Sequence, residues 1–332
     1  MSALFDPYRL DARLDAAGGA VPPDAVRRTE EKLAALTGRR RCLLVSSGRD
    51  ALKAALKAAG VKKGSAVAMT NLTHPSAPEA AAWSGAVPLF AEISARNLNI
   101  SGAALRAAVR KADALLLTHM FSASAGAAAA GRACAAAGIP LVEDASQIIG
   151  ESEKGRPYGS FGLVSVFSLS PYKPVSCPGH RAGALLCDDE KVFSRLKRLA
   201  AGFPPPPPAA AARLLWKLEL LPATLERLGR INAAYRAAFS GLRGVALPKA
   251  GPRAHEFPLL TSRRDGLLAA LKRAGIPPER TYEPFNACYG APGGYPASAA
   301  YALEAVQLPV YPLMTEGETE HVIRTVKKFF AR

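Results

Sequence analysis

The stretch LLVSSGRDALKAAL, residues 43–56, decides the fold, because it passes from an apolar run through a short polar loop into a helix-like run. The apolar run predicts a buried strand over 42–46, and the spacing that follows predicts a helix over 49–59. Free N–H groups at a helix start favour an anion, and Gly48 lets the backbone approach one closely. The loop is therefore a candidate phosphate site, although serine and glycine also simply form turns.

The same order of elements recurs through the first half of the chain. Alternation of this kind predicts an α/β fold with a mainly parallel sheet between two layers of helices. Two more strands, 161–169 and 182–187, follow each other without a helix and predict a mixed part of the same sheet. The repeated elements are strands at 66–70, 87–93, 114–119 and 140–143 and helices at 76–83, 102–111 and 125–137, with Ser101 as a cap.

The character of the chain changes after residue 202. The stretch GFPPPPPAAAA, residues 202–212, predicts an exposed loop over 203–212, because prolines neither continue a helix nor pair in a sheet. A connecting helical stretch is expected over 213–241, broken or kinked at Pro222. We expect a large domain over 1–241 and a small carboxyl-terminal α+β domain over 242–332, with strand 256–261 and helices 265–273, 297–305 and 315–330.

Composition excludes several classes of protein. Hydrophobic residues make up 49% of the 332 residues, which indicates a folded globular protein. No apolar run is long enough to span a membrane and the opening residues carry charges, so we expect a cytoplasmic protein. The five cysteines and five histidines form no metal-ligand pattern, so no metal is expected. The net charge of +16 indicates a basic surface or anionic substrates, and no nucleic-acid-binding motif accompanies it.

Two further polar residues follow predicted strands. Asp144 comes directly after strand 140–143, and Lys173 follows strand 161–169 between Pro171 and Pro174. Alone, each has an ordinary explanation, as a helix cap or as a surface lysine. Together with the phosphate loop they match pyridoxal phosphate, which needs a lysine for an imine bond, a carboxylate for its pyridine nitrogen and an anion site.

Four segments carry a resemblance to a known family. They are VSSGRDALKAAL (45–56), LVEDASQIIGESEKGRPYGSFG (141–162), FSLSPYK (167–173) and LPVYPLMTEGETEHVIRTVKKFF (308–330). Their content and order resemble the sugar aminotransferases of the DegT/DnrJ/EryC1/StrS type, within fold type I of the pyridoxal-phosphate enzymes. The resemblance covers nearly the whole chain and is far more specific than one short motif.

The resemblance implies a role for each matching residue. Lys173 is expected to form the imine and carry protons, and Asp144 to pair with the pyridine nitrogen. The other cofactor-binding residues are expected to be Gln147 at the ring hydroxyl, His74 stacked on the ring, Ser168 at the phosphate, and Gly48, Arg49 and Asp50 in the phosphate loop. Outside these positions, His119 is expected to make a structural hydrogen bond, and His255 and His321 to be surface or packing residues.

The sequence also departs from the family pattern. Arg49 stands where the family has threonine, and Ala210 where it has an asparagine that reaches the partner subunit's phosphate. Arg49 or Arg213 could compensate by turning toward the phosphate.

The resemblance implies a homodimer that transfers an amino group from an amino acid, with glutamate as the expected donor, to a nucleotide-linked keto sugar. A sugar dehydratase and a catalytically altered or inactive binding or structural subunit remain as alternatives. Dehydratases of the family commonly replace the lysine by histidine, so Lys173 argues against the first of these.

Overall fold

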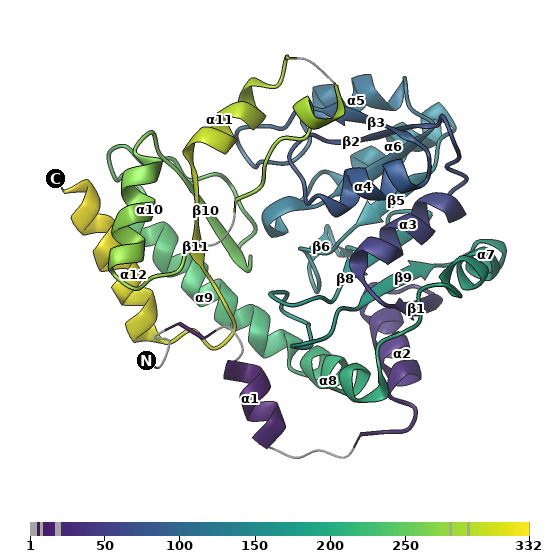
Figure 1. Cartoon of the computed structure of the whole chain (residues 1–332), viewed down its shortest axis with the longest axis horizontal. Coiled ribbons are helices and arrows are strands. Elements are labelled where there is room, and N and C mark those ends of the chain that lie inside the picture. Colours follow the sequence, from purple (N-terminus) through teal and green to yellow (C-terminus); the bar gives the residue numbers. More distant parts are fainter. Residues whose placement is uncertain (1–4, 7–8, 17–20, 279–280, 291–292, 332) are drawn as a thin grey trace.

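The computed structural model describes residues 5–6, 9–16, 21–278, 281–290 and 293–331. Seven strands form one sheet in the order β1-β9-β8-β5-β4-β2-β3 (Figure 1). Neighbouring strands run parallel except at β9, which is antiparallel to both β1 and β8. This confirms the predicted α/β fold and its mixed portion. The strands are β1 (Arg41–Val45), β2 (Ala66–Thr70), β3 (Val87–Ala91), β4 (Ala114–Thr118), β5 (Leu141–Asp144), β8 (Val164–Ser168) and β9 (Gly183–Cys187).

Helices cover both faces of this sheet. One hydrophobic cluster joins it to α3 (Gly48–Ala58), α4 (Ser76–Trp83) and α7 (Glu190–Ala200). Another joins the opposite face to α2 (Ala25–Thr37), α5 (Gly102–Val109) and α6 (Ala127–Ala137). Along β4, Ala114 and Leu116 belong to the first cluster, whereas Leu115 and Leu117 belong to the second. Since successive side chains of a strand point to opposite faces, a strand buried on both sides must be apolar throughout.

The carboxyl-terminal part is built on a two-stranded antiparallel sheet, which lies beside the large sheet with α10 and α12 on its outer side (Figure 1). A single hydrophobic cluster contains Phe257 and Val306 from this sheet together with Leu44 and Leu115 from the large one. Because the core is continuous, the domain boundary at 241/242 stays a prediction. The elements are β10 (Glu256–Leu260), α10 (Arg264–Arg273), η2 (Ala287–Tyr289), α11 (Pro296–Glu304), β11 (Ala305–Pro309) and α12 (Glu316–Phe330).

The expected loop over 203–212 is wrong in its second half. α8 (Pro208–Glu219) begins at the last proline, and Ala210, Ala211 and Ala212 are buried. Proline is tolerated at the first helical position, where its missing N–H has no partner in any case, and alanine is the best helix former. The small side chains allow close packing against α2, where the Thr29 hydroxyl donates to the carbonyl of Ala211 at 3.0 Å.

The break expected at Pro222 is confirmed, because α8 ends at Glu219 and α9 (Leu221–Phe239) begins beside that proline. Several elements were not predicted, since their sequences are short or mostly polar. These are α1 (Arg9–Ala16), α2, α7, the hairpin of β6 (Ser152–Glu153) with β7 (Arg156–Pro157), and η1 (Met120–Ser122). No helix in the described ranges is long and apolar enough to cross a membrane. Within the same ranges, no group of three His, Cys, Asp or Glu side chains could hold a metal ion.

The start of α3 packs directly onto the end of β8. A Cβ atom at Gly48 would lie 2.6 Å from the Cβ of Ser168, a distance at which the backbone must move. Only glycine therefore permits this approach, which brings the helix N-terminus against the last residue of the strand. Ser47 caps the helix, and its hydroxyl accepts from the N–H of Asp50 at 3.1 Å.

We predict that Gly48→Ala lowers the free energy of unfolding by ~1–3 kcal/mol, because the added methyl group displaces Ser168. Gly131→Ala is the matched control, since Gly131 lies within α6 and has no neighbour within 4 Å of an added Cβ. This control should be neutral or stabilising by up to about 1 kcal/mol. Urea unfolding compares the two variants, and an unchanged stability in Gly48→Ala would contradict the close approach.

Glu143 holds the loop that leads from β7 into β8. Its two oxygens accept from the N–H groups of Gly159 (2.8 Å) and Phe161 (2.7 Å), and its Oε2 also accepts from the Ser165 hydroxyl (3.0 Å). The ring of His119 lies 3.4 Å from Oε1. Burial alone would raise the pKa of Glu143, but these partners outweigh it and lower the pKa to about 2. The carboxylate thus fixes β5 and β8 next to each other, and both strands end at the site.

We predict that Glu143→Gln costs about 3 kcal/mol of stability at neutral pH, because it removes a buried charge from its hydrogen-bonding partners. The folded pKa lies below the usual 4.5, so the wild-type advantage is present above pH 4.5 and disappears as pH falls toward 2. Urea unfolding of both proteins across this range measures the difference. The exposed Glu226→Gln should change stability by less than about 1 kcal/mol. A difference between wild type and Glu143→Gln that persists unchanged at pH 2.5 would contradict the assignment.

Candidate active site

The polar residues singled out in the sequence lie where parallel strands end at one edge of the large sheet. β5 ends at Asp144 and β8 ends at Ser168, and these two strands are parallel neighbours. The backbone N–H of Ser168 donates to the Ser146 hydroxyl at 2.9 Å, which ties the two strand ends together. In open α/β sheets this edge is where ligands bind.

The loop before α3 forms the part of the site that suits an anion. The hydroxyls of Ser46 and Ser47 donate to the Asp50 carboxylate at 2.8 and 2.6 Å. Burial tends to raise the pKa of Asp50, but hydrogen bonds from Ser47, Ser46 and Lys53 outweigh this and lower it. Asp50 is therefore an ionised acceptor that orients the loop, and the N–H groups at the start of α3 are the groups that suit a phosphate.

Arg49 lies at this loop, but its guanidinium is already engaged. Its Nε is 3.1 Å from a carboxylate oxygen of Glu79 on α4, and both side chains are more than two-fifths exposed. The predicted turn of Arg49 toward the phosphate would have to compete with this ion pair. Arg213, the other candidate for compensation, lies 3.8 Å from Asp11 of α1.

Asp144 is a buried carboxyl group, only 5% exposed. Its Oδ1 accepts from the N–H of Ser146 at 3.1 Å. Burial raises its pKa, and the hydrogen bonds from Ser146 and the charge of Lys173 oppose this only in part. Within the described residues no basic side chain forms an ion pair with Asp144. A buried carboxylate of this kind favours a cationic partner, which a ligand can provide.

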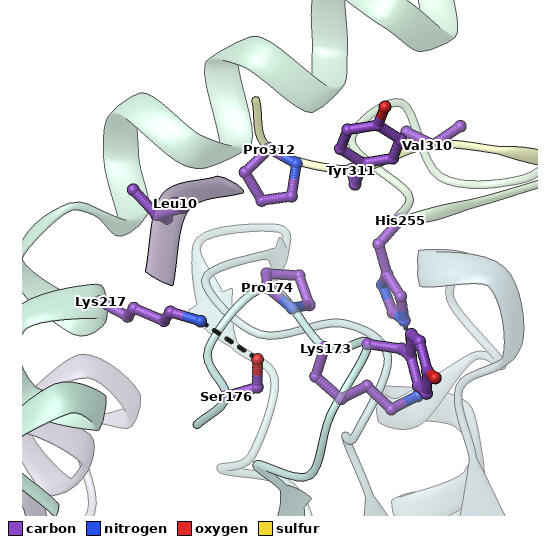
Figure 2. Close-up of a pocket in the computed structure, with 10 residues that line it drawn as sticks. Leu10, Lys173, Pro174, Ser176, Lys217, His255, Val310, Tyr311 and Pro312 are labelled. Atoms are coloured by element: carbon purple, nitrogen blue, oxygen red, sulfur yellow. Dashed lines mark hydrogen bonds between the residues drawn. The ribbon is translucent and has the colours of Figure 1, made fainter. Parts of the chain in front are cut away.

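Lys173 is half-buried in the turn that follows β8. The residue before it, Tyr172, has a φ of 72°, which is uncommon for a residue other than glycine. The Nζ atom of Lys173 lies 3.4 Å from Nε2 of His255. Figure 2 shows both residues lining a small cavity, together with Lys217 of α8 and with Val310 and Tyr311 after β11. Lys173 thus lines a cavity to which both the large sheet region and the carboxyl-terminal part contribute residues.

His255 was expected to be a surface or packing residue, and the surface alternative is wrong because the side chain is buried. It is 6% exposed and lies against the candidate catalytic lysine, directly before β10. Burial, with the nearby charge of Lys173, lowers the pKa of His255 well below its usual value. The imidazole is therefore neutral at physiological pH and can accept a hydrogen bond from an ammonium group. Nothing in the local sequence indicated this, because Lys173 lies far away along the chain.

Gln147 lies at the same edge, and both ends of its amide make a hydrogen bond. Its Oε1 accepts from the N–H of Phe121 at 2.5 Å, and its Nε2 donates to the hydroxyl of Tyr282 at 2.7 Å. That hydroxyl donates to Oε1 of Glu256 at 2.7 Å. The prediction from sequence included Gln147 but missed Tyr282 and Glu256, which come from the carboxyl-terminal part and belong to no recognised motif.

The remaining predicted residues differ in what the structure shows. His74 is exposed at the start of α4, where its Nδ1 lies 2.9 Å from the Ser76 hydroxyl. Its stacking role stays a prediction. The structural hydrogen bond expected of His119 is confirmed, since its Nδ1 accepts from the N–H of Ala125 at 3.1 Å. Ala210 is buried in the main hydrophobic cluster, so its side chain packs within its own subunit.

These residues fit the requirements of pyridoxal phosphate. Gly48 lets the N-terminus of α3 pack against Ser168, which brings helix N–H groups and a serine hydroxyl close together. The buried Asp144 lacks a cation among the described side chains, and a protonated pyridine nitrogen is such a cation. Lys173 provides an amine in a cavity wall. The donors and acceptors therefore match the phosphate, the ring nitrogen and the aldehyde.

Comparison with known proteins identifies the family. The profile of the DegT/DnrJ/EryC1/StrS aminotransferase family matches residues 18–202 and 208–327. The dTDP-3-amino-3,4,6-trideoxy-alpha-D-glucose transaminase of Streptomyces venezuelae is 27% identical over 313 residues, which cover 87% of this chain and 82% of that protein. The UDP-2-acetamido-2-deoxy-3-oxo-D-glucuronate aminotransferase of Pseudomonas aeruginosa is 25% identical over 311 residues, covering 87% and 86%.

Solved structures agree with this result. The crystal structure of S. venezuelae DesV has a TM-score of 0.88 at 26% identity, covering 98% of this chain and 95% of that one. A DegT/DnrJ/EryC1/StrS aminotransferase from Brucella abortus has a TM-score of 0.84 at 26% identity, covering 97% and 94%. The predicted fold type I is confirmed. The chain belongs to the DegT/DnrJ/EryC1/StrS family of pyridoxal-phosphate-dependent aminotransferases.

Proposed function

We propose that this protein transfers an amino group from L-glutamate to the ketone of a nucleotide-linked sugar, using pyridoxal phosphate. Two observations carry the proposal: Lys173 lies in a cavity wall, and Asp144 is buried without an ion-pair partner among the described residues. In the overall reaction the donor exchanges its amine and α-hydrogen for the ketone oxygen of the acceptor, so the products are 2-oxoglutarate and an amino sugar.

The proposed phosphate end of the site is the start of α3. The N–H groups there and the Ser168 side chain bind the phosphate, while Gly48 allows close approach. Arg49 lies beside them, and its guanidinium would have to leave the ion pair with Glu79 to reach the phosphate. Asp50 keeps the hydroxyls of Ser46 and Ser47 in place, and its charge is already satisfied by these donors and by Lys53.

The proposed ring site uses Asp144, Gln147 and His74. The Asp144 carboxylate holds a proton on the pyridine nitrogen, Gln147 donates to the ring hydroxyl, and His74 stacks on the ring. When bound, pyridoxal phosphate supplies the aldehyde that carries the amino group and a ring that accepts the electrons left when the donor loses its α-proton. Because the ring nitrogen stays protonated, Asp144 contributes to the rate and not only to binding.

Lys173 is proposed to bond to the cofactor in the resting enzyme and, once released, to move the proton from the donor's α-carbon. His255, neutral and 3.4 Å from Nζ, can accept a hydrogen bond from the released ammonium group. It thereby holds the amine near the reacting atoms while the substrate occupies its place.

The names of two relatives and the net charge of the protein support a nucleotide-linked sugar as the amino-group acceptor. The two relatives described above act on dTDP- and UDP-linked sugars according to their names. The net charge of +16 favours attraction of a dianionic diphosphate group.

The direct experiment loads the protein with pyridoxal phosphate and adds L-glutamate without an acceptor. We expect one equivalent of 2-oxoglutarate per active site, and none from Lys173→Ala, which should still bind pyridoxamine phosphate. The exposed Lys191→Ala is the control and should behave like wild type. Full release of the oxo acid by Lys173→Ala would contradict the role of this lysine.

A second prediction concerns Asp144. Asp144→Asn keeps the size of the side chain but removes its charge, so transamination should fall roughly 10²–10³-fold while cofactor affinity falls far less. The exposed Asp265→Asn is the control. Steady-state rates and a cofactor titration measure the two effects. Unchanged rates in Asp144→Asn would exclude an ion pair with the ring.

We also propose that the protein is a two-fold homodimer, because fold-type-I enzymes generally build each active site between two subunits. Ala210 is buried in its own subunit, so any partner donor to the phosphate comes from another position. Sedimentation at micromolar concentration should give twice the mass of the chain. An active monomer would contradict this. The expected cytoplasmic location rests on the sequence alone.

A further inference from the structure

Three side chains form a hydrogen-bonded relay between the two parts of the chain. Gln147 follows β5, whereas Tyr282 lies after α10 and Glu256 is the first residue of β10. Nε2 of Gln147 donates to the Tyr282 hydroxyl, and this hydroxyl donates to Glu256, with both contacts at 2.7 Å. Glu256 is 8% exposed and Gln147 is 5% exposed, so solvent offers little competition.

The chemistry of the groups fixes the direction of the relay. Oε1 of Glu256 accepts from the Tyr282 hydroxyl, and this bond uses the one proton of that hydroxyl. The hydroxyl oxygen then accepts, and the nitrogen of the Gln147 amide must face it. At the other end of the amide the N–H of Phe121 requires an acceptor, which is Oε1 of Gln147 at 2.5 Å. A flipped amide would place donor against donor at Phe121 and acceptor against the oxygen of Tyr282.

Glu256 is a buried carboxyl group, and burial raises its pKa. Lys173 is the nearby cation that opposes the effect of burial, and His255 Nε2 lies 4.0 Å from Oε1 of Glu256. The second oxygen, Oε2, is buried without a hydrogen-bond partner among the described residues. An acceptor that is neither solvated nor shared with another donor makes the bond from Tyr282 strong and its direction definite.

The segment that carries Tyr282 is itself fixed to the edge of the large sheet. Oδ1 of Asn71, directly after β2, accepts from the N–H groups of Phe285 at 3.1 Å and Asn286 at 2.8 Å. Nδ2 of Asn71 donates to Oδ1 of Asn286 at 2.9 Å. The ring of Tyr282 packs edge-on against Phe121, with ring centroids 5.8 Å apart. The hydroxyl is therefore held close to one position.

The Gln147 amide therefore has one N–H group that is available to a ligand. Nε2 of Gln147 carries two hydrogens, and Tyr282 accepts one of them. For the other, the described residues provide no acceptor. Because both ends of the amide are fixed, this N–H keeps its direction before any ligand arrives, and a ligand oxygen gains a donor that needs no reorganisation.

We propose that Tyr282 and Glu256 are positioning residues that hold the Gln147 amide with its free N–H toward the ring hydroxyl oxygen of the cofactor. This inference rests on the proposed function, since it takes the ligand to be a pyridoxal phosphate. It adds a contribution of the carboxyl-terminal part to cofactor recognition, made through residues that do not touch the cofactor themselves.

The test measures binding and not turnover. The probes are pyridoxamine phosphate and its analogue without the ring hydroxyl, neither of which can bond covalently to Lys173. Tyr282→Phe removes only the hydroxyl, and it should weaken pyridoxamine phosphate by about tenfold while leaving the deoxy analogue unchanged. Tyr295→Phe is the matched control, because its hydroxyl donates to the Phe90 carbonyl at 3.2 Å and has no link to the relay. It should change neither affinity.

Two further variants keep the test decisive. Glu256→Gln leaves Tyr282 a neutral partner of either polarity, so it should give a smaller loss that again depends on the ring hydroxyl. In a Gln147→Leu background, Tyr282→Phe should have no additional effect, because the residue through which it acts is absent. Equal weakening of both probes by Tyr282→Phe would indicate a general structural role and overturn the inference, as would no weakening of either probe.

The outcomes also separate this inference from the proposed function. If wild type binds pyridoxamine phosphate and releases 2-oxoglutarate but Tyr282→Phe binds both probes normally, the relay alone is refuted. If wild type binds neither probe, the proposed function and the relay are both refuted.

Discussion

The site depends on a carboxylate, Asp144, that is buried at the end of β5 with no cationic side chain paired to it among the described residues. Removing such a group from water costs several kcal/mol unless charge or hydrogen bonds compensate. Here one N–H of Ser146 and the more distant Lys173 compensate only in part. The fold therefore keeps an unpaired charge that a bound cation would stabilise.

Glu143, the residue before Asp144, is a buried carboxylate with a full set of partners. Glu143 precedes Asp144 on the same strand, and it is satisfied by N–H groups of the 159–162 loop, by Ser165 and by His119. Its pKa falls to about 2, whereas the pKa of Asp144 rises. Successive side chains of a strand point to opposite faces of the sheet. Glu143 therefore stabilises the sheet, while Asp144 faces the candidate site.

Much of the architecture could be predicted from the sequence. The strands around residues 42–46, 66–70 and 140–143 are short apolar runs, and their polar endings led to the prediction that the loop before α3 and Asp144 belong to a site. The proline-flanked turn after the strand at 161–169 likewise indicated Lys173, whereas Ser168 was predicted from the family resemblance alone. These signals are local, and local patterns report the period and the end of an element well.

Predictions from the sequence were wrong or incomplete where contacts between distant parts of the chain determine the structure. Prolines suggested that 203–212 is a loop, but packing against α2 stabilises a helix that begins at Pro208. His255, Glu256 and Tyr282 lie in no motif. His255 contacts Lys173 and Tyr282 contacts Gln147 across more than 80 residues, and Glu256 accepts from Tyr282. Hydrophobic periodicity carries no information about such pairs.

The identity of the lysine that bonds to the cofactor tests the account most directly. Two lysines line the same cavity (Figure 2). Lys217 is the more buried of the two, and its Nζ lies 2.7 Å from Asp11. Burial lowers the pKa of Lys217 in spite of this ion pair, which makes it the natural competitor. Reduction of the cofactor-loaded protein with borohydride, followed by peptide mass mapping, should place the added mass on Lys173 alone. The same mass on Lys217, or on no lysine, would contradict the account.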